Sequence, residues 1–111
     1  NFAFIMGYTN ASWTLKADIA ASYFCKLLNY MRKNKLAVVC PRVAPDVTDT
    51  GENMTGLSSG YLTRALDSMP KQGSKHPWRT LQNFLVDKFN LWWGGIEDES
   101  LEFISCDKKS L

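Results

Sequence analysis

The sequence predicts an α+β fold, in which a strand and a helix from an α/β layer precede a mostly helical second half. Residues 2–6 are apolar on both alternating faces, which is typical of a strand that helices cover on each side. Residues 13–34 repeat apolar side chains at helical spacing. After residue 40, Pro and Gly separate short segments, two of which have a helical pattern.

The predicted first strand, residues 2–6, runs into a turn, because Gly7 and Asn10 tolerate the backbone angles that a sharp turn requires. A strand that is apolar on both faces belongs inside a sheet, and these 111 residues do not contain that sheet. We therefore expect the chain to be the tail end of a larger protein, with N-terminal domains preceding it.

The predicted helix, residues 13–34, begins beside Ser12 or Thr14, either of which can cap free N–H groups with its hydroxyl. It ends at Asn34, after Arg32 and Lys33, whose charges complement the negative end of the helix dipole. Its apolar positions form a broad stripe for burial: Leu15, Ile19, Tyr23, Leu27 and Met31, widened by Ala20, Phe24 and Leu28.

The remaining elements are a short strand at 36–40, a long loop at 41–59, helices at 60–69 and 78–92, and a candidate strand at 100–106. Pro41 ends the short strand. Ser58 or Ser59 caps the first of these helices and Pro70 terminates it, while Pro77 suits the first turn of the second. The second helix has one shared face, formed by Leu81, Phe84, Leu85, Lys88 and Trp92.

Composition excludes several classes of protein. A net charge of +2 with dispersed cations does not indicate a nucleic-acid partner. No apolar run reaches the roughly 18–20 residues of a transmembrane helix. The three cysteines form no CxxC pair, so neither a zinc ribbon nor a disulfide framework is expected. A reducing, cytoplasmic setting is the simplest interpretation.

The sequence offers no candidate catalytic residue and no metal site. The single histidine, His76, lies in a Pro-flanked loop, and we expect it at the surface. The acidic run at 97–99 follows a Gly-Gly break and is expected to be a solvated loop. Neither GxGxxG nor GxxxxGK[ST] occurs, so the chain contains no fingerprint for nucleotide phosphates.

The positive signal is the junction between the first predicted strand and the helix that follows it. Ligands of open α/β sheets bind outside the carboxyl ends of the strands, and a helix N-terminus offers free N–H groups to an anion. Lys16 is unusual there, because a cation in the first turn opposes the helix dipole by about 0.3–1 kcal/mol. An anionic ligand or a carboxylate such as Asp18 would offset that cost; alternatively, Lys16 points into water.

Two aromatic positions leave alternatives open. Trp13 either faces a cofactor ring or packs under the loop at 41–59. Trp92 and Trp93 are adjacent in the sequence, so one of them points away from the local core. We expect this pair to form an interface with a domain outside the chain.

The residues match a known pattern over nearly the whole chain. The run NFAFIMGYTNASWTLKADIAASYFCKLLNYM resembles the final strand and helix of the Rossmann-like FAD domain in bacterial class B flavin monooxygenases. The runs GYLTRALDSMPKQGSKHPWR and QNFLVDKFNLWWGGIEDESLEF are similar to the C-terminal segment of the same group. This group is the Baeyer–Villiger enzymes, which include the ethionamide-activating monooxygenase of mycobacteria. The resemblance makes residues 1–40 the end of the FAD domain and residues 60–111 the C-terminal segment.

The resemblance also implies an activity and its cofactors, FAD and NADPH. In such enzymes reduced flavin and oxygen give a C4a-peroxyflavin, which inserts one oxygen atom into a ketone or oxidises sulfur. The residues implied as flavin contacts, mainly through backbone N–H groups, are Trp13, Thr14, Leu15 and Lys16. The residues implied to line the approach to the flavin ring and the substrate pocket are Thr9, Asn10 and Ser12.

The same resemblance places the glycine fingerprints for both cofactors upstream of Asn1, in the N-terminal FAD and NADPH domains. We therefore expect the chain alone to be inactive. The alternative is a non-catalytic, truncated module that binds a protein partner or self-associates through the apolar face of its long helix.

Overall fold

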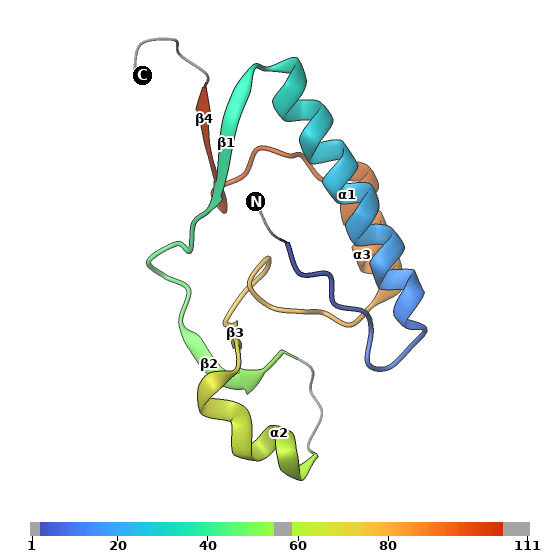
Figure 1. Ribbon diagram of the computed structural model, residues 1–111, viewed down its shortest axis with the longest axis vertical. Coiled ribbons are helices and arrows are strands. Elements are labelled where there is room, and N and C mark those ends of the chain that lie inside the picture. The colour runs from blue at the N-terminus through green and yellow to red at the C-terminus, as the bar shows by residue number, and fades with distance from the viewer. Residues whose placement is uncertain (1–2, 55–58, 106–111) are drawn as a thin grey trace.

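The computed structural model describes residues 3–54 and 59–105 (Figure 1). Its elements in chain order are α1 (Trp13–Lys33), β1 (Leu36–Pro41), β2 (Asp49–Asn53), α2 (Gly60–Ala65), a 3-10 turn (Leu66–Ser68), β3 (Lys71–Gly73), α3 (Phe84–Trp93) and β4 (Leu101–Ser105). In the described ranges the strands form two antiparallel pairs, β1 with β4 and β2 with β3. The α+β character of the predicted fold is confirmed.

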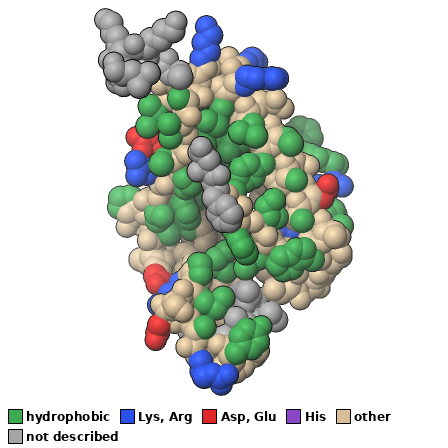
Figure 2. All heavy atoms as spheres, in the orientation of Figure 1, with side chains coloured by type: hydrophobic (Ala, Val, Ile, Leu, Met, Phe, Trp, Pro, Cys, Tyr) green, Lys and Arg blue, Asp and Glu red, His purple; other side chains and the backbone are tan. Residues whose placement is uncertain are grey.

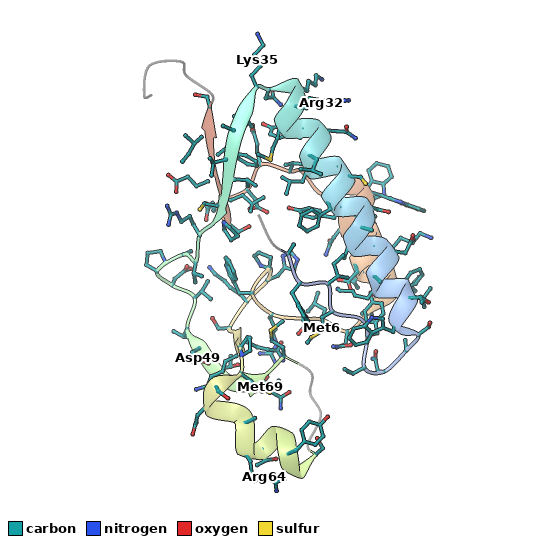
Figure 3. All side chains as sticks on the ribbon, in the orientation of Figure 1. Met6, Arg32, Lys35, Asp49, Arg64 and Met69 are labelled. Carbon is teal, nitrogen blue, oxygen red and sulfur yellow. The ribbon has the colours of Figure 1, made fainter. Side chains whose placement is uncertain are left out.

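Helix α1 agrees closely with the predicted helix at 13–34. It ends because Lys35 takes a left-handed φ of 54° that no helix can continue. The Asn34 N–H still makes the helical bond to the Tyr30 carbonyl at 3.0 Å, whereas the Lys35 N–H turns to the Arg32 carbonyl at 3.4 Å. Arg32 and Lys33 lie in the last turn, where the dipole favours cations. Arg32 and Lys35 are both at this end of the helix, next to the start of β1 (Figure 3).

The sheet of β1 and β4 confirms two predicted strands. Val39 pairs with Phe103 and Pro41 with Leu101, with an irregularity after Leu36. The Phe103 ring lies 5.5 Å from the Tyr30 ring, centroid to centroid, so this sheet packs against the C-terminal half of α1. Cys106, the last residue of the predicted strand, lies outside the described residues.

The predicted strand at 2–6 is not formed over residues 3–6, and Phe2 lies outside the described residues. Residues 3–6 belong to neither sheet, and Phe4 and Ile5 are 77% and 40% exposed. A strand needs neighbours that exchange backbone hydrogen bonds with it. Neither described sheet provides such a neighbour for this segment.

A second lobe contains β2, β3 and α2 (Figure 1). The predicted loop at 41–59 is therefore wrong where β2 forms. Side chains hold this short pair together: Thr50 Oγ1 donates to the Gln72 carbonyl, and Gln72 Nε2 donates to the Asn53 carbonyl, both at 3.0 Å. These contacts lie 19–22 residues apart in the sequence, which is why no local pattern indicates them.

The predicted helix at 60–69 is divided into α2 and a 3-10 turn that ends at Ser68. The Thr63 N–H binds the Ser59 carbonyl at 3.0 Å, so Ser59 occupies the start of α2. The alternative cap, Ser58, lies outside the described residues. Pro70 follows the turn, consistent with its predicted role as terminator.

Helix α3 begins at Phe84, six residues later than the predicted start at 78. The backbone of residues 78–80 is engaged elsewhere: the Trp78 carbonyl accepts from Gly73 N–H at 2.8 Å, and Thr80 N–H donates to Gln72 Oε1 at 3.0 Å. Asn83 then caps α3, because its side chain accepts from the N–H groups of the second and third helical residues.

Helices α1 and α3 lie side by side and run in the same direction (Figure 1). Near the C-terminal end of α3, Lys26 Nζ donates to the Leu91 and Gly94 carbonyls at 3.0 and 2.8 Å. This lysine satisfies carbonyls that have no partner within the helix and complements the negative end of its dipole. Beyond α3, the Tyr30 hydroxyl donates to the Glu97 carboxylate.

The apolar core among the described residues is small. Only Tyr8, Ile19, Leu27 and Ile96 are buried apolar side chains there. The radius of gyration is 16.0 Å, against about 13 Å for a compact domain of 100 residues. Hydrophobic side chains are spread over the face shown in Figure 2. No helix in the described ranges is long and apolar enough to cross a membrane.

The predicted apolar stripe of α1 is therefore buried only in part. Ile19 and Leu27 are buried, while Phe24 and Leu28 are 37% and 58% exposed. The uncovered part lines an open groove of about 750 Å³ between α1 and β1. The apolar stripe of α1 is wide enough to predict a packing partner along its whole length, but this part of the stripe faces the open groove.

We expect the 111 residues, expressed alone, to unfold without a sharp cooperative transition, because so little apolar surface is removed from water. Thermal and urea unfolding followed by circular dichroism, together with binding of a hydrophobic dye, test this. A steep transition of a monomer that binds no dye would contradict it and favour a self-sufficient module.

Candidate functional site

The turn before α1 is built around the contact between Gly7 and Trp13. A Cβ atom placed on Gly7 would lie 2.2 Å from Cδ2 of the Trp13 indole, so a larger residue would displace the ring. Trp13 packs against the turn that precedes it, and 52% of the residue stays exposed. Leu15, two residues on, is 39% exposed.

The start of α1 carries no side-chain cap. Ser12 holds the N-cap position, but its hydroxyl pairs with the Thr14 hydroxyl at 2.9 Å and makes no capping hydrogen bond. The predicted capping by either hydroxyl is therefore wrong. The first turn also contains no acidic residue. The positive end of the α1 dipole consequently has neither a capping oxygen nor a carboxylate in its own first turn.

Lys16 binds a carboxylate of the second half of the chain. Its Nζ lies 2.5 Å from Asp87 Oδ2, and the Tyr8 hydroxyl donates to the same oxygen at 2.5 Å. The side chains of Lys16 and Asp87 are 23% and 12% exposed. The expected carboxylate partner of Lys16 is thus present, but it is Asp87 and not Asp18, and the alternative that Lys16 points into water is wrong.

This cluster, which we call the Tyr8–Lys16–Asp87 cluster, is largely shielded from water. Tyr8 is only 3% exposed. Burial raises the pKa of the Tyr8 hydroxyl well above its usual value of 10.0, and the hydrogen bond to Asp87 raises it further. The Lys16 ammonium also lies 5.1 Å from the centroid of the Tyr8 ring, within the range of a cation–π contact.

Gln82 holds the other end of the same turn. Its side-chain Oε1 accepts from the Thr9 N–H at 3.1 Å, and its carbonyl accepts from Asn10 Nδ2 at 3.0 Å. Gln82 has a φ of 51°, a left-handed conformation that is uncommon outside glycine. Residues 82–87 therefore bind the turn before α1 from two sides.

A cavity of about 490 Å³ lies beside the cluster, between α1, α3 and the turn at 76–78. Lys16 and Asp87 form part of its wall, with Tyr23 and Trp78 among its aromatic lining. Burial and the nearby Asp98 raise the pKa of the Tyr23 hydroxyl. With largely apolar walls and a few polar groups, the cavity has the character of a site for a small organic molecule. His76, exposed as predicted, lies at its rim.

The structure brings the sequence-predicted residues together unevenly. Thr9 and Asn10 face Gln82, Trp13 and Thr14 are exposed at the tip, and Lys16 points to α3. Sequence reasoning missed Tyr8, Gln82 and Asp87. The signal that was available is the position of Asp87, the single acidic residue within a largely apolar helical segment, three residues after Phe84 and four before Leu91.

The predicted shared face of α3 is confirmed for Phe84, Lys88 and Trp92, because Lys88 Nζ lies 5.3 Å from the Phe84 ring centroid and 5.0 Å from the Trp92 ring centroid. Leu85 and Trp92 are 75% and 66% exposed. The side of α3 that meets α1 carries Asp87, whose carboxylate binds Lys16. The outward face is apolar and contains Leu85, Phe89, Trp92 and Trp93.

The residues at the α1 tip fit the electron-rich edge of a flavin. Uncapped N–H groups at a helix start are suited to partial negative charge, and the exposed Trp13 and Thr14 leave that start accessible. A metal ion has no equivalent site, since the described residues contain no group of three or more His, Cys, Asp or Glu side chains that could hold one. Within those residues, Cys25 and Cys40 are free thiols.

Comparison with known proteins identifies relatives over almost the whole chain. MymA of Mycobacterium tuberculosis (strain CDC 1551 / Oshkosh) is 48% identical over 106 residues, covering 96% of this chain and 21% of MymA. EthA of M. tuberculosis (strain ATCC 25618 / H37Rv), an FAD-containing monooxygenase, is 47% identical over 104 residues, covering 93% of this chain and 21% of EthA. EthA of Mycolicibacterium smegmatis is 44% identical over 103 residues, with the same coverage of each chain. MymA has the same description, FAD-containing monooxygenase, given as a provisional assignment.

The chain thus spans about a fifth of the length of the curated relatives that it matches. It is homologous to that segment of FAD-containing monooxygenases, which confirms the resemblance drawn from its sequence. No family model matches the chain. No solved structure matches it.

We expect Lys16→Met and Asp87→Asn each to lower the free energy of unfolding of the complete gene product by about 1–3 kcal/mol, because each leaves one shielded charge unpaired. The double variant should lose less than the sum of the two. A double-mutant cycle in urea measures this coupling. The exposed pair Lys75–Asp46 serves as the control, with a coupling of about 0–1 kcal/mol. Equal couplings in the two pairs would contradict the assignment.

We expect Tyr8 to make stability fall in alkaline solution. Its pKa is raised in the folded state, so above about pH 10 the unfolded chain releases this proton while the folded chain keeps it. The contribution is fully present below pH 10 and decreases as the pH rises. Urea unfolding from pH 8 to pH 11 should show a shallower decline for Tyr8→Phe than for the natural sequence. Identical slopes would contradict this.

Proposed function

We propose that this chain, homologous to one segment of the FAD-containing monooxygenases, forms the C-terminal portion of an FAD- and NADPH-dependent monooxygenase. The observation that carries the proposal is the uncapped start of α1, in a chain 47% identical to part of EthA. Bound FAD, once reduced by NADPH, supplies the oxygen chemistry, in which one atom of O2 is inserted into a ketone or added to sulfur. The residues of this chain bind and orient that group.

The tip of α1 binds the pyrimidine edge of the flavin. The backbone N–H groups of Trp13 and Thr14 lie in the first turn of the helix, where hydrogen bonds to an acceptor outside the helix are available. The Leu15 N–H, in the same turn, also donates to the Ser12 carbonyl at 3.2 Å. Lys16 lies in the same turn, and its ammonium is paired with Asp87. The exposed side chain of Trp13 shields the edge from water.

The turn before the helix lines the approach of the substrate to the flavin ring. The Thr9 backbone N–H and the Asn10 side chain both donate to Gln82, so the second half of the chain holds this turn in place. Ser12 is exposed beside them. The neighbouring cavity of about 490 Å³, with its aromatic walls, is large enough for a small ketone or sulfide.

The two halves of the chain take different places in the enzyme. Residues 1–40 complete the FAD domain. Residues 60–111 form a C-terminal segment that packs on the N-terminal FAD and NADPH domains. The groove beside α1 and the outward face of α3 supply the apolar surface for that packing.

A second candidate function is a non-catalytic module that binds a protein partner or self-associates. The observation that favours it is the same exposed apolar surface, including Trp92 and Trp93 at 66% and 76% exposure. Light scattering of the isolated chain distinguishes the two. A stable, folded homodimer of these residues favours the module, whereas solubility only together with the flavin domains favours the enzyme.

We expect the complete gene product to purify with bound FAD, visible as the absorbance of an oxidised flavin. It should oxidise NADPH in the presence of O2 and a ketone or sulfide. Mass spectrometry of the products then separates ester formation from sulfur oxidation. A colourless product that takes up no added FAD would contradict the proposal.

We expect Gly7→Val to weaken flavin binding, because a larger side chain at residue 7 displaces the indole of Trp13.

A further inference from the structure

We propose that Asp87 is a positioning residue for the flavin: it holds Lys16 at the tip of α1 and cancels its charge, and so sets the electrostatic field that the tip presents. The inference rests on the proposed function, because it requires a flavin at that tip. It assigns a role in the flavin site to the second half of the chain, 71 residues away from Lys16 in the sequence.

The geometry of the cluster fixes the carboxylate from two directions. Asp87 Oδ2 accepts from the Tyr8 hydroxyl and from Lys16 Nζ, each at 2.5 Å. Asp87 also lies in the first turn of α3, where a carboxylate is favoured by the helix dipole. The Tyr8 hydroxyl, the Lys16 ammonium and the α3 dipole therefore all stabilise the Asp87 carboxylate beside the start of α1.

The partial burial of this pair gives its charges a longer reach than surface charges have. The side chain of Asp87 is 12% exposed and that of Lys16 is 23% exposed. Water and salt screen such a pair less than an exposed one. Removal of either charge is consequently felt by a group bound at the helix tip.

The sign of each effect follows from the charge that is removed. A reduced flavin carries negative charge at the edge that the α1 tip faces in the proposed function. Without the Asp87 carboxylate, the Lys16 ammonium is uncompensated and stabilises that negative charge. Without the Lys16 ammonium, the Asp87 carboxylate is uncompensated and destabilises it. A purely structural salt bridge predicts no such opposition, since loss of either partner loosens the same contact.

The test is the reduction potential of bound FAD in the complete gene product, measured by spectroscopic titration against reference dyes. Asp87→Asn should shift the potential upward, Lys16→Met should shift it downward, and the double variant should return close to the natural value. Asp46→Asn removes the same charge from an exposed pair in the second lobe and should leave the potential unchanged.

Each outcome decides the proposal. Opposite shifts that cancel in the double variant support it. Bound FAD with an unchanged potential in both single variants, or shifts of the same sign, overturns it and leaves the proposed function standing. A gene product that binds no flavin overturns both. If Asp87→Asn does not retain FAD, the Lys16 series decides: Lys16→Met must lower the potential while Lys16→Arg preserves it, and a natural potential in Lys16→Met overturns the proposal.

Discussion

The contact between Lys16 and Asp87 is the constraint on which the arrangement of this chain depends. It joins the first turns of two parallel helices, α1 and α3. The two residues are 71 positions apart in the sequence, so this contact is not a consequence of local chain geometry. Parallel helices place their positive ends side by side, which is unfavourable unless an anion lies between them. Asp87 is that anion. At the opposite, negative end of α3 the charge is a cation: Lys26 donates to the carbonyls of Leu91 and Gly94.

The two ends of α3 thus carry the charges that its dipole favours, and both charges serve contacts with α1. The turn before α1 is held by the same segment, through Gln82. The second half of the chain is therefore a scaffold for the helix tip. A ligand at that tip would interact with residues of the first half whose position depends on the second.

Polar contacts have this importance because the apolar contacts are incomplete. Four buried apolar side chains in the described residues contribute little compared with the cost of ordering the backbone. Large apolar side chains instead remain on the outer face of α3 and along the groove beside α1. This distribution resembles an interface more than a finished surface, and it agrees with a chain that spans a fifth of its relatives.

The sequence by itself determined the elements whose signals are local. Helix α1 follows from its apolar period and from Asn34, and β1 and β4 follow from short apolar runs with a proline at the end of β1. Tertiary structure decided the rest, because the deciding partners are distant in the sequence. Asp87 pairs with Lys16, and Gln72 holds β2 to β3. Helix α3 starts only at Phe84, because the backbones of Trp78 and Thr80 are hydrogen-bonded to Gly73 and Gln72. A charge in a helical pattern shows that a partner is needed, but only the folded chain shows which carboxylate provides it.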